Sequence, residues 1–294
     1  MPHSADRSRA FLWIWIAYLA AVAAALLVGL ALAGRHPLEI VFAADLVATL
    51  VVFGFSFAFG NSSFYDPYWS VAPPAIALAF AFGAEPGAAE PARQALVIAL
   101  IALWAVRLTW NWARGWSGLH HEDWRYVDMR QSSGGLYWGV SLLAIHLFPT
   151  LIVFLGCLPL WPALAEGARP LGALDALGAA LAFGGTALEF VADNQLRRFR
   201  LAGPPPGSTL ESGLWGWSRH PNYLGEILFW FGLASFGLAA GGFRWWGWLG
   251  ALAMLAMFRF ASLPMIEKRM LARRPGYAER QRRVSLLIPW PPKA

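Results

Sequence analysis

The sequence from 218 to 226, Ser-Arg-His-Pro-Asn-Tyr-Leu-Gly-Glu, places ionisable and polar side chains directly before an apolar, aromatic run that extends to Ala240. Charged groups at the edge of hydrocarbon are costly to dehydrate, so they mark a candidate functional site. Nothing in the apolar run would offset the desolvation of Arg219 or Glu226. We therefore expect both side chains to have a partner, either another protein group or a ligand.

A second polar set follows a helical period. Its members are spaced by four, four and three residues, which places them on one face of a helix. They are Glu189, Asp193, Arg197 and Arg200. A salt-bridge ladder within this helix is one interpretation. A ligand cradle is favoured, because the stripe leads directly to the Arg219 segment.

The apolar run before residue 114 ends in a similar way. Arg107, Asn111 and Arg114 are spaced by four and three residues, so they project from one helical face. Arg114 is close enough to the interface to extend its charge into water, whereas Arg107 is too deep for this. The next segment, with Arg125 and Tyr126, is either a structured loop with internal ion pairs or a lid over a bound cofactor.

Asp66 lies between Tyr65 and Tyr68 at the start of a short apolar run. Asp-Pro favours a turn, and turn formation or helix capping alone would explain this carboxylate. A carboxyl group and two phenols at a helix entrance could also supply a proton. The lone Asp45 and His146 are expected to be hydrogen-bonded inside the protein.

The composition is that of an integral membrane protein. Hydrophobic residues make up 58% of the 294 residues, against roughly 45–50% in soluble domains. About 20 apolar residues cross a bilayer. We predict an all-α membrane bundle of seven to eight transmembrane helices. The predicted spans are 11–33, 39–60, 69–83 (short), 95–113, 136–162, 173–192, 225–241 and 245–265.

Lysine and arginine gather in alternate connections, and this asymmetry sets the orientation. Both termini are predicted to be cytoplasmic, in a bacterial inner membrane. The net charge of +6 then reflects topology and attraction to anionic membrane lipid, and no nucleic-acid partner is expected. Residues 1–38 are expected to form an anchor helix and residues 39–294 one membrane domain.

Neither the single cysteine nor the adjacent histidines is expected to form a functional site. Cys157 is expected to be a packed thiol. The adjacent His120 and His121 do not converge on a helix, so no metal site is expected. No oligomeric state is predicted.

Four segments of the sequence form a recognisable set. They are Leu103-Trp-Ala-Val-Arg107-Leu-Thr, Glu122-Asp-Trp-Arg125-Tyr126, Gly213-Leu-Trp-x-x-Ser-Arg219-His-Pro-Asn222-Tyr223-x-Gly-Glu226, and Arg274-Pro-Gly-Tyr277 with Ile288-Pro-Trp. Together they are similar to the bacterial DUF1295 proteins, which in turn resemble the C-terminal domain of steroid 5-alpha-reductases, and the resemblance covers roughly residues 40–292. The shorter Arg-His-Pro-x-Tyr core also occurs in sterol C14 reductases and isoprenylcysteine carboxyl methyltransferases.

The resemblance implies a helical membrane fold that holds NADPH from the cytoplasmic side. It also implies reduction of a carbon–carbon double bond conjugated to a carbonyl, in a lipophilic, steroid-like substrate. Guanidinium groups suit phosphates, while carboxylates and amides suit ribose hydroxyls and a carboxamide. The cofactor contacts of the reductases match Asp193, Arg200, Asn222 and Glu226. The full cofactor-binding prediction is Arg107, Asn111, Arg125, Tyr126, Asp193, Arg197, Arg200, Arg219, His220, Asn222, Tyr223 and Glu226.

Hydride addition builds negative charge on the carbonyl oxygen, which then needs a proton donor or hydrogen bond. In the steroid enzymes a glutamate and a tyrosine hold this ketone. The counterpart of the tyrosine is Trp104, and the nearest equivalent of the glutamate is Asp66. These departures count against a steroid substrate. We predict Asp66, with Tyr65 and Tyr68, as the catalytic residues.

Two other functions fit parts of the pattern. Methyltransferases that use S-adenosylmethionine share the Arg-His-Pro-x-Tyr core, but their glutamate pair is replaced here by Glu267-Lys268. A non-catalytic lipid-binding or transport protein is the other alternative. Binding of NADPH separates both from a reductase.

Overall fold

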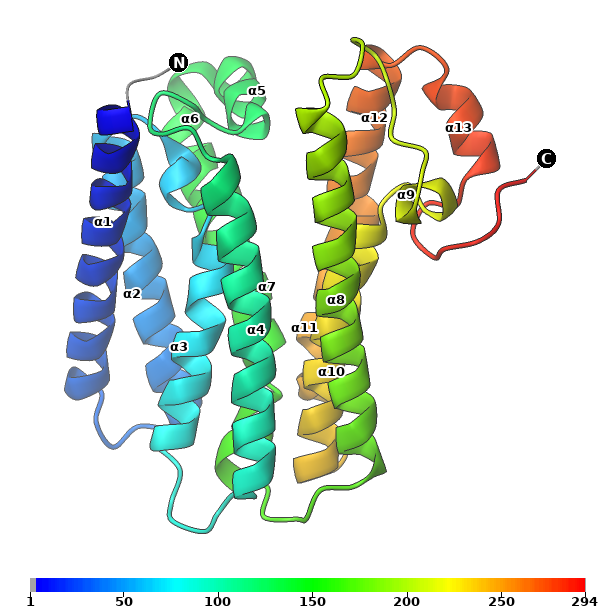
Figure 1. Cartoon of the computed structure of the whole chain (residues 1–294). Coiled ribbons are helices and arrows are strands. Elements are labelled where there is room, and N and C mark those ends of the chain that lie inside the picture. Colours follow the sequence, from blue (N-terminus) through cyan, green and yellow to red (C-terminus); the bar gives the residue numbers. More distant parts are fainter. Residues whose placement is uncertain (1–3, 294) are drawn as a thin grey trace.

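Helices form most of the computed structural model, which describes residues 4–293 (Figure 1). These residues contain no β-strand, so the predicted all-α class is confirmed. The α-helices are α1 (Ser4–Ala31), α2 (Pro37–Ala58), α3 (Tyr68–Phe82), α4 (Pro91–Gly115), α5 (Trp124–Ser133), α6 (Tyr137–Val140), α7 (Phe148–Cys157), α8 (Ala173–Leu201), α9 (Leu214–Trp217), α10 (Pro221–Gly241), α11 (Leu249–Met257), α12 (Leu263–Arg273) and α13 (Tyr277–Arg283). Short 3₁₀ turns are η1 (Ser62–Phe64), η2 (Gly134–Leu136) and η5 (Trp245–Trp248), and π-helical segments are η3 (Ser141–Leu147), η4 (Pro162–Glu166) and η6 (Phe258–Ser262).

Seven helical stretches of the described chain are long and apolar enough to cross a membrane, which confirms the predicted number of seven to eight. The predicted span at 69–83 corresponds to α3, which has 15 residues. At 1.5 Å per residue it rises about 22 Å, less than the roughly 30 Å of a hydrocarbon core. The seven stretches are Asp6–Ala31, Pro37–Ala58, Pro91–Gly115, Trp124–Glu166, Ala173–Leu201, Pro221–Gly241 and Trp245–Arg273.

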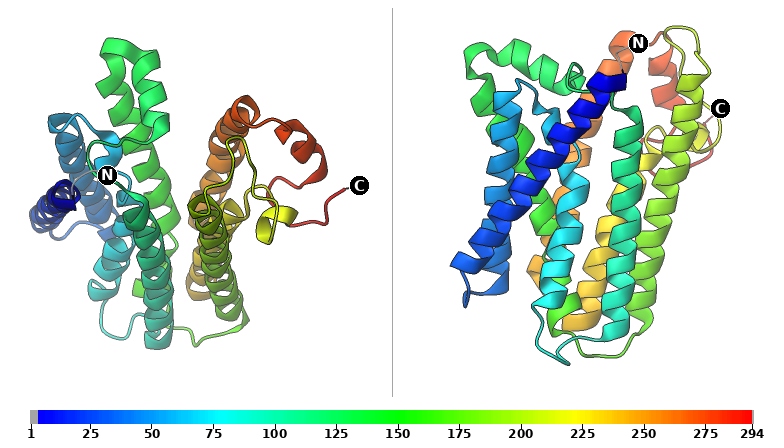
Figure 2. Two further views of the ribbon diagram at one scale, coloured as in Figure 1. Left: turned by 45° about the horizontal axis from the view of Figure 1, so that its top comes forward. Right: turned by 60° about the vertical axis from the view of Figure 1, so that its left-hand side comes forward.

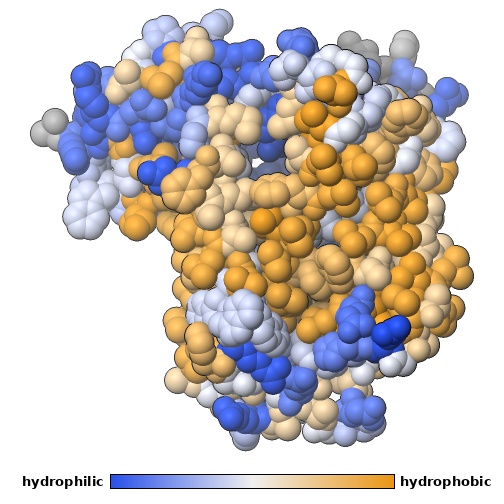
Figure 3. Space-filling model, turned by 180° about the vertical axis from the view of Figure 1, so that it is seen from behind, coloured by the Kyte–Doolittle hydropathy of each residue, from blue (hydrophilic) through white to orange (hydrophobic). Residues whose placement is uncertain are grey.

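The outer surface has the banded pattern of a membrane protein. Apolar side chains cover the middle of the face in Figure 3, and hydrophilic residues gather toward both ends. Large apolar side chains are exposed, such as Leu30 at 74% and Phe82 at 85%, which is favourable against lipid rather than water. The chain is therefore an integral membrane protein. α1 begins, and α13 lies, at the same end of the bundle (Figure 1); that this end is cytoplasmic stays a prediction.

α8 and α10 lie side by side, and α4 faces α8 (Figure 2). Small residues permit the close approach of α8 to α10. A Cβ added at Gly185 of α8 would lie 2.4 Å from the carbonyl oxygen of Gly225 in α10. Further along, Gly178 and Ala182 contact Gly232 in the same way. Contacts between small residues hold many membrane helices together, and here they bring the polar ends of α8 and α10 into contact.

Gly185→Ala is expected to lower the free energy of unfolding by about 1–3 kcal/mol, because added atoms in a filled contact force the helices apart. Gly184→Ala is the matched control, since a Cβ there meets no atom within 4 Å and alanine has the better helix propensity. Thermal unfolding in detergent measures both variants. Equal melting temperatures would show that α8 and α10 do not pack this closely.

Candidate functional site

A buried polar core, defined as Arg107, Glu189, Asp193, Asn222 and Glu226, lies where α4, α8 and α10 meet. Arg107 donates to Glu189 Oε2 at 2.6 Å and to Asp193 Oδ2 at 3.0 Å. Asn222 donates to Asp193 Oδ1 at 3.2 Å. Asp193 therefore links α4 and α8 to the signature segment at the start of α10.

A shell of amides surrounds this core toward the end of α4. Asn111, one turn after Arg107, donates to Asp193 Oδ2 at 3.1 Å. Arg114 donates to the amide oxygens of Asn111 and Asn194, each at 2.7 Å. The predicted polar faces of α4 and α8 therefore contact each other. Arg107, which lies too deep to reach water, is neutralised by Glu189 and Asp193.

Glu226 is held by three indole groups. Its Oε1 accepts from Trp69 Nε1 and Trp230 Nε1, both at 2.9 Å, and its Oε2 accepts from Trp104 Nε1 at 3.0 Å. The indoles come from α3, α4 and α10. Because an indole N–H only donates and a carboxylate only accepts, the partners match without any mobile proton. Trp104 is fixed further by stacking on Phe229 with 4.4 Å between ring centroids.

The first half of the signature is tied to the C-terminal segment through Glu267. His220 Nε2 lies 2.7 Å from Glu267 Oε1, and Tyr277 donates to the same oxygen at 2.6 Å. Arg219 forms an ion pair with Glu267 Oε2 at 3.1 Å. The backbone N–H of Arg219 also donates to Ser285 at 2.9 Å. These contacts place α10, α12 and α13 around one cavity.

That cavity, here called the arginine cavity, has a volume of about 400 Å³ and is lined in part by Tyr277 and Arg280 of α13. Its described lining contains no aspartate or glutamate, while Asn222, Tyr223, Trp124 and Trp215 supply amide and aromatic surface. Six guanidinium groups line it; those of Arg219, Arg269 and Arg280 pair with Glu267, Asp128 and Glu211. The other three make the cavity electropositive. The arginines are Arg200, Arg219, Arg269, Arg273, Arg274 and Arg280.

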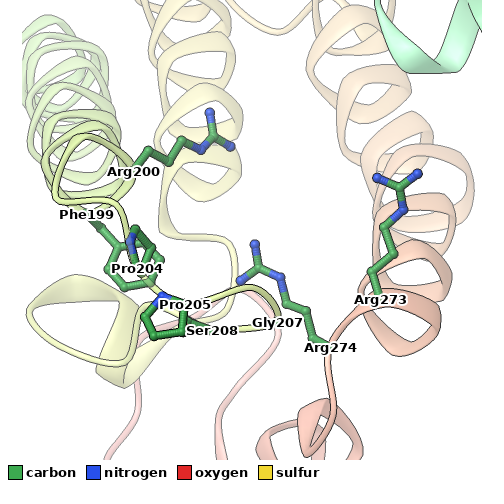
Figure 4. A pocket seen from close by; sticks show the side chains of 8 residues that line it. All are labelled: Phe199, Arg200, Pro204, Pro205, Gly207, Ser208, Arg273 and Arg274. Atoms are coloured by element: carbon green, nitrogen blue, oxygen red, sulfur yellow. The ribbon is translucent and has the colours of Figure 1, made fainter.

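A second hollow of about 520 Å³ adjoins it and shares Arg200, Arg273 and Arg274. Figure 4 shows these side chains extending from α8 and from the end of α12 along the rim of the hollow. Among the described residues, no hydrogen bond or ion pair involves the guanidinium groups of these three arginines. Three unpaired guanidinium groups at one rim can bind an anion with several acceptor oxygens.

The family model described as "Protein of unknown function (DUF1295)" matches residues 52–284. This chain belongs to the DUF1295 family. An uncharacterized protein, C594.04c, of Schizosaccharomyces pombe is 29% identical to this DUF1295 protein over 262 residues, which cover 81% of this chain and 76% of the yeast protein. No solved structure matches it significantly. The predicted resemblance to DUF1295 proteins is therefore confirmed, and the likeness to steroid 5-alpha-reductases stays an expectation.

The predicted cofactor residues of this DUF1295 protein fall into three places. Arg107, Asn111, Asp193, Asn222 and Glu226 meet in or beside the polar core, and Arg200, Arg219, His220, Asn222 and Tyr223 line the arginine cavity. Arg125 instead pairs with Asp123 at 2.8 Å, and Tyr126 donates to Asp66 at 2.8 Å. Neither they nor Arg197 line the cavity.

The three predicted catalytic residues have separate partners. Tyr65 is bonded to Thr150 at 2.6 Å, and Tyr68 donates to Asp45 at 2.7 Å, although the two rings stack at 5.0 Å. Asp66 accepts from Tyr126, and none of the three lines the arginine cavity. The expected internal bonding of Asp45 is confirmed, as is that of His146, whose Nε2 lies 3.0 Å from Ser56 Oγ. The role of Asp66, Tyr65 and Tyr68 at the substrate carbonyl stays a prediction.

Asp66 provides a test of pH dependence. Burial raises its pKa from 3.8 to about 7, although the hydrogen bond from Tyr126 lowers it. The folded protein therefore holds this proton over a pH range in which the unfolded chain has lost it. The free energy of unfolding should fall as pH rises from 3.8 to about 7, by at most about 1.4 kcal/mol per pH unit.

Asp66→Asn is expected to remove this contribution and to flatten the decrease in melting temperature over the same range. Glu85→Gln, in the exposed loop before α4, is the control for loss of one carboxylate. Melting curves in detergent at a series of pH values compare the two. A decrease that is unchanged in Asp66→Asn would mean that Asp66 does not carry the shifted proton.

Several partners in the site were not among the predicted site residues. Glu189 was identified only as part of the helical stripe, and Trp69, Trp230 and Glu267 were not predicted as contacts. The sequence did indicate that partners must exist, because the charged groups of Glu226 and Arg219 both need a partner at the membrane. It did not indicate which residues those partners are.

Proposed function

We propose that this DUF1295 protein is an integral membrane, NADPH-dependent reductase of a carbon–carbon double bond conjugated to a carbonyl in a lipophilic substrate. The observation that carries the proposal is the arginine cavity, because Asn222 lines it and is also bonded to the buried polar core. An electropositive, aromatic-lined cavity that leads to buried carboxyl and amide groups suits a phosphorylated dinucleotide.

The charged, polar and aromatic side chains of the cavity match the chemical groups of NADPH. Asn222 Oδ1 is buried with no hydrogen-bond partner, so it is free to accept from a bound ligand. Arg200, Arg273 and Arg274 would hold phosphate groups, and Asp193 with Asn222 would hold ribose or carboxamide groups. Trp215, which also lines the cavity, offers an aromatic surface for the adenine ring.

NADPH bound there would supply the hydride. The chain's own contribution is to hold the cofactor in one orientation and to exclude water from the reacting end. The polar core does this with fully buried groups, since Arg107, Glu189 and Glu226 are each less than 9% exposed. A lipophilic substrate would come from the bilayer, which would contact the apolar face that Figure 3 shows.

Titration of the purified protein with NADPH and NADH tests the proposal. NADPH should bind more tightly, because the 2′-phosphate meets unpaired guanidinium groups. Arg274→Gln should weaken NADPH binding about 10- to 100-fold, the loss expected for a charged hydrogen bond of about 1.5–3 kcal/mol, and should change NADH binding much less. Arg35→Gln, in the exposed α1–α2 connection, is the control. Equal affinity for the two nucleotides would contradict the proposal.

A further inference from the structure

The chain after α13, residues 284–293, lies beside the bundle. Figure 1 places it with α9 at the outer side of α8, short of the end of that helix. Two hydrogen bonds fix the level of α9 along α8. Trp215 Nε1 donates to the carbonyl oxygen of Ala192 at 2.9 Å, and the backbone N–H of Leu214 donates to Gln195 Oε1 at 3.0 Å. α9 is therefore level with the part of α8 that precedes its basic end.

That part of α8 is apolar on the outside. Phe190 and Val191, directly before Ala192, are exposed, and exposed apolar side chains of an integral membrane protein are favourable against lipid. The helix becomes basic from Arg197 onward. Because arginine side chains at a helix end extend toward the polar headgroups, the boundary between hydrocarbon and headgroups lies close to α9.

The C-terminal segment is bonded to α9 and to the residue after it. The backbone N–H of Trp290 donates to the carbonyl oxygen of Trp217 at 3.0 Å. Ser218 Oγ donates to the carbonyl oxygen of Leu287 at 2.7 Å. These bonds hold the segment at the level of α9, so it also lies close to the headgroup boundary.

Three large apolar side chains of α9 and this segment are exposed. Trp217 is 51% exposed, Ile288 68% and Trp290 67%. Tryptophan is enriched where headgroups meet hydrocarbon, because its ring is apolar and its N–H is polar. These side chains therefore fit the headgroup boundary of a bilayer better than they fit water.

Cations lie beside the apolar side chains. The backbone N–H of Lys293 donates to the carbonyl oxygen of Arg283 at 3.0 Å, and Arg283 Nε donates to that of Lys293 at 3.2 Å. Both residues are exposed, and among the described residues neither forms an ion pair. Arg282, which is also exposed, pairs with Glu279. Arg283 and Lys293 are thus the two cations with charge available for an anionic partner.

We propose that Trp217, Ile288 and Trp290 insert into the headgroup region of the bilayer beside α8, and that Arg283 and Lys293 bind the phosphates of anionic lipids there. These five residues are called the C-terminal platform. Apolar side chains flanked by cations are typical of segments that lie in the plane of a membrane interface. A soluble partner protein would require the platform to lie in water, whereas α9 is level with the lipid-facing part of α8. The inference does not depend on binding of NADPH.

Quenching by brominated lipid tests the insertion. Ile288→Cys is labelled with an environment-sensitive fluorophore in the full chain and reconstituted into phosphatidylcholine vesicles whose acyl chains are brominated near the headgroup. The native Cys157 is buried and should not react. The fluorophore should lose fluorescence nearly as strongly as one at Val106→Cys, on the exposed face of α4, and far more than one at Gln131→Cys, on exposed α5. Quenching no stronger than at Gln131→Cys would overturn the insertion.

The anionic partner is tested in vesicles with equal fractions of phosphatidylcholine and phosphatidylglycerol, of which only one is brominated. Brominated phosphatidylglycerol should quench the Ile288→Cys fluorophore more strongly, because each basic residue enriches anionic lipid about fivefold, the ratio that corresponds to about 1 kcal/mol. Adding Arg283→Gln and Lys293→Gln together should remove this difference and retain the quenching itself. Arg35→Gln, in the exposed α1–α2 connection, should retain both. Equal quenching by the two lipids, or a difference that persists without Arg283 and Lys293, would overturn the phosphate contacts.

Discussion

Arg107→Met is expected to lower the free energy of unfolding by about 3–5 kcal/mol, because removal of one partner from a buried ion pair leaves the opposite charge uncompensated. Arg107 is 8% exposed and binds Glu189 and Asp193 at 2.6 and 3.0 Å. Methionine fills similar volume, so the loss would reflect charge rather than a cavity. Thermal or denaturant unfolding in detergent measures the effect.

Two further variants make this expectation specific. Arg35→Met removes an exposed arginine from the α1–α2 connection and should leave stability unchanged. The triple variant Arg107→Met, Glu189→Gln, Asp193→Asn removes both unpaired charges and should recover most of the lost stability. If Arg107→Met is as stable as Arg35→Met, Arg107 does not neutralise the two carboxylates.

Asn222→Ala and Glu226→Ala are each expected to abolish measurable turnover. Asn222 lines the arginine cavity, and among the described residues its side-chain oxygen is buried without a hydrogen-bond partner. Glu226→Ala leaves the three indole N–H groups of Trp69, Trp104 and Trp230 without their acceptor. Loss of a single preorganised polar group in a dry site costs about 100- to 1,000-fold in rate. Turnover of an accepted enone at saturating NADPH is the measurement.

The two variants should differ in their other properties. Asn222→Ala should weaken NADPH binding with little change in melting temperature, whereas Glu226→Ala should lower the melting temperature because buried indole donors are left unpaired. Asn194→Ala is a suitable control, since Asn194 is bonded to Arg114 at the edge of the core. Full activity in either Asn222→Ala or Glu226→Ala would mean that the signature has a structural role only.

Most of the fold could be predicted because a helix that crosses a lipid bilayer needs a run of about 20 apolar residues, which is visible in the sequence. Long apolar runs mark the spans, and helical spacing correctly placed Arg107 and Asn111 on one face and Glu189 and Asp193 on another. The short span predicted at 69–83 is α3, which the structure shows as a 15-residue helix with Pro73 and Pro74 inside it. Length and composition alone do not say whether such a helix is counted as a crossing.

The partners within the site could not be predicted in the same way. Glu226 receives donors from α3, α4 and α10, and Glu267 binds residues from both sides of the cavity. Such contacts depend on how helices distant in sequence pack, and local spacing carries no information about that. Asp66 shows the same limit, because its neighbours in sequence are Tyr65 and Tyr68 but its partner is Tyr126, sixty residues away.

Binding of NADPH in the arginine cavity is the central claim, and a structure of the purified protein with saturating NADPH tests it most directly. The expected result is a nucleotide whose phosphate groups lie beside Arg200, Arg273 and Arg274 and whose nicotinamide end lies toward Asn222. A cavity without nucleotide at saturating NADPH, or nucleotide bound only elsewhere on the protein, would contradict the claim.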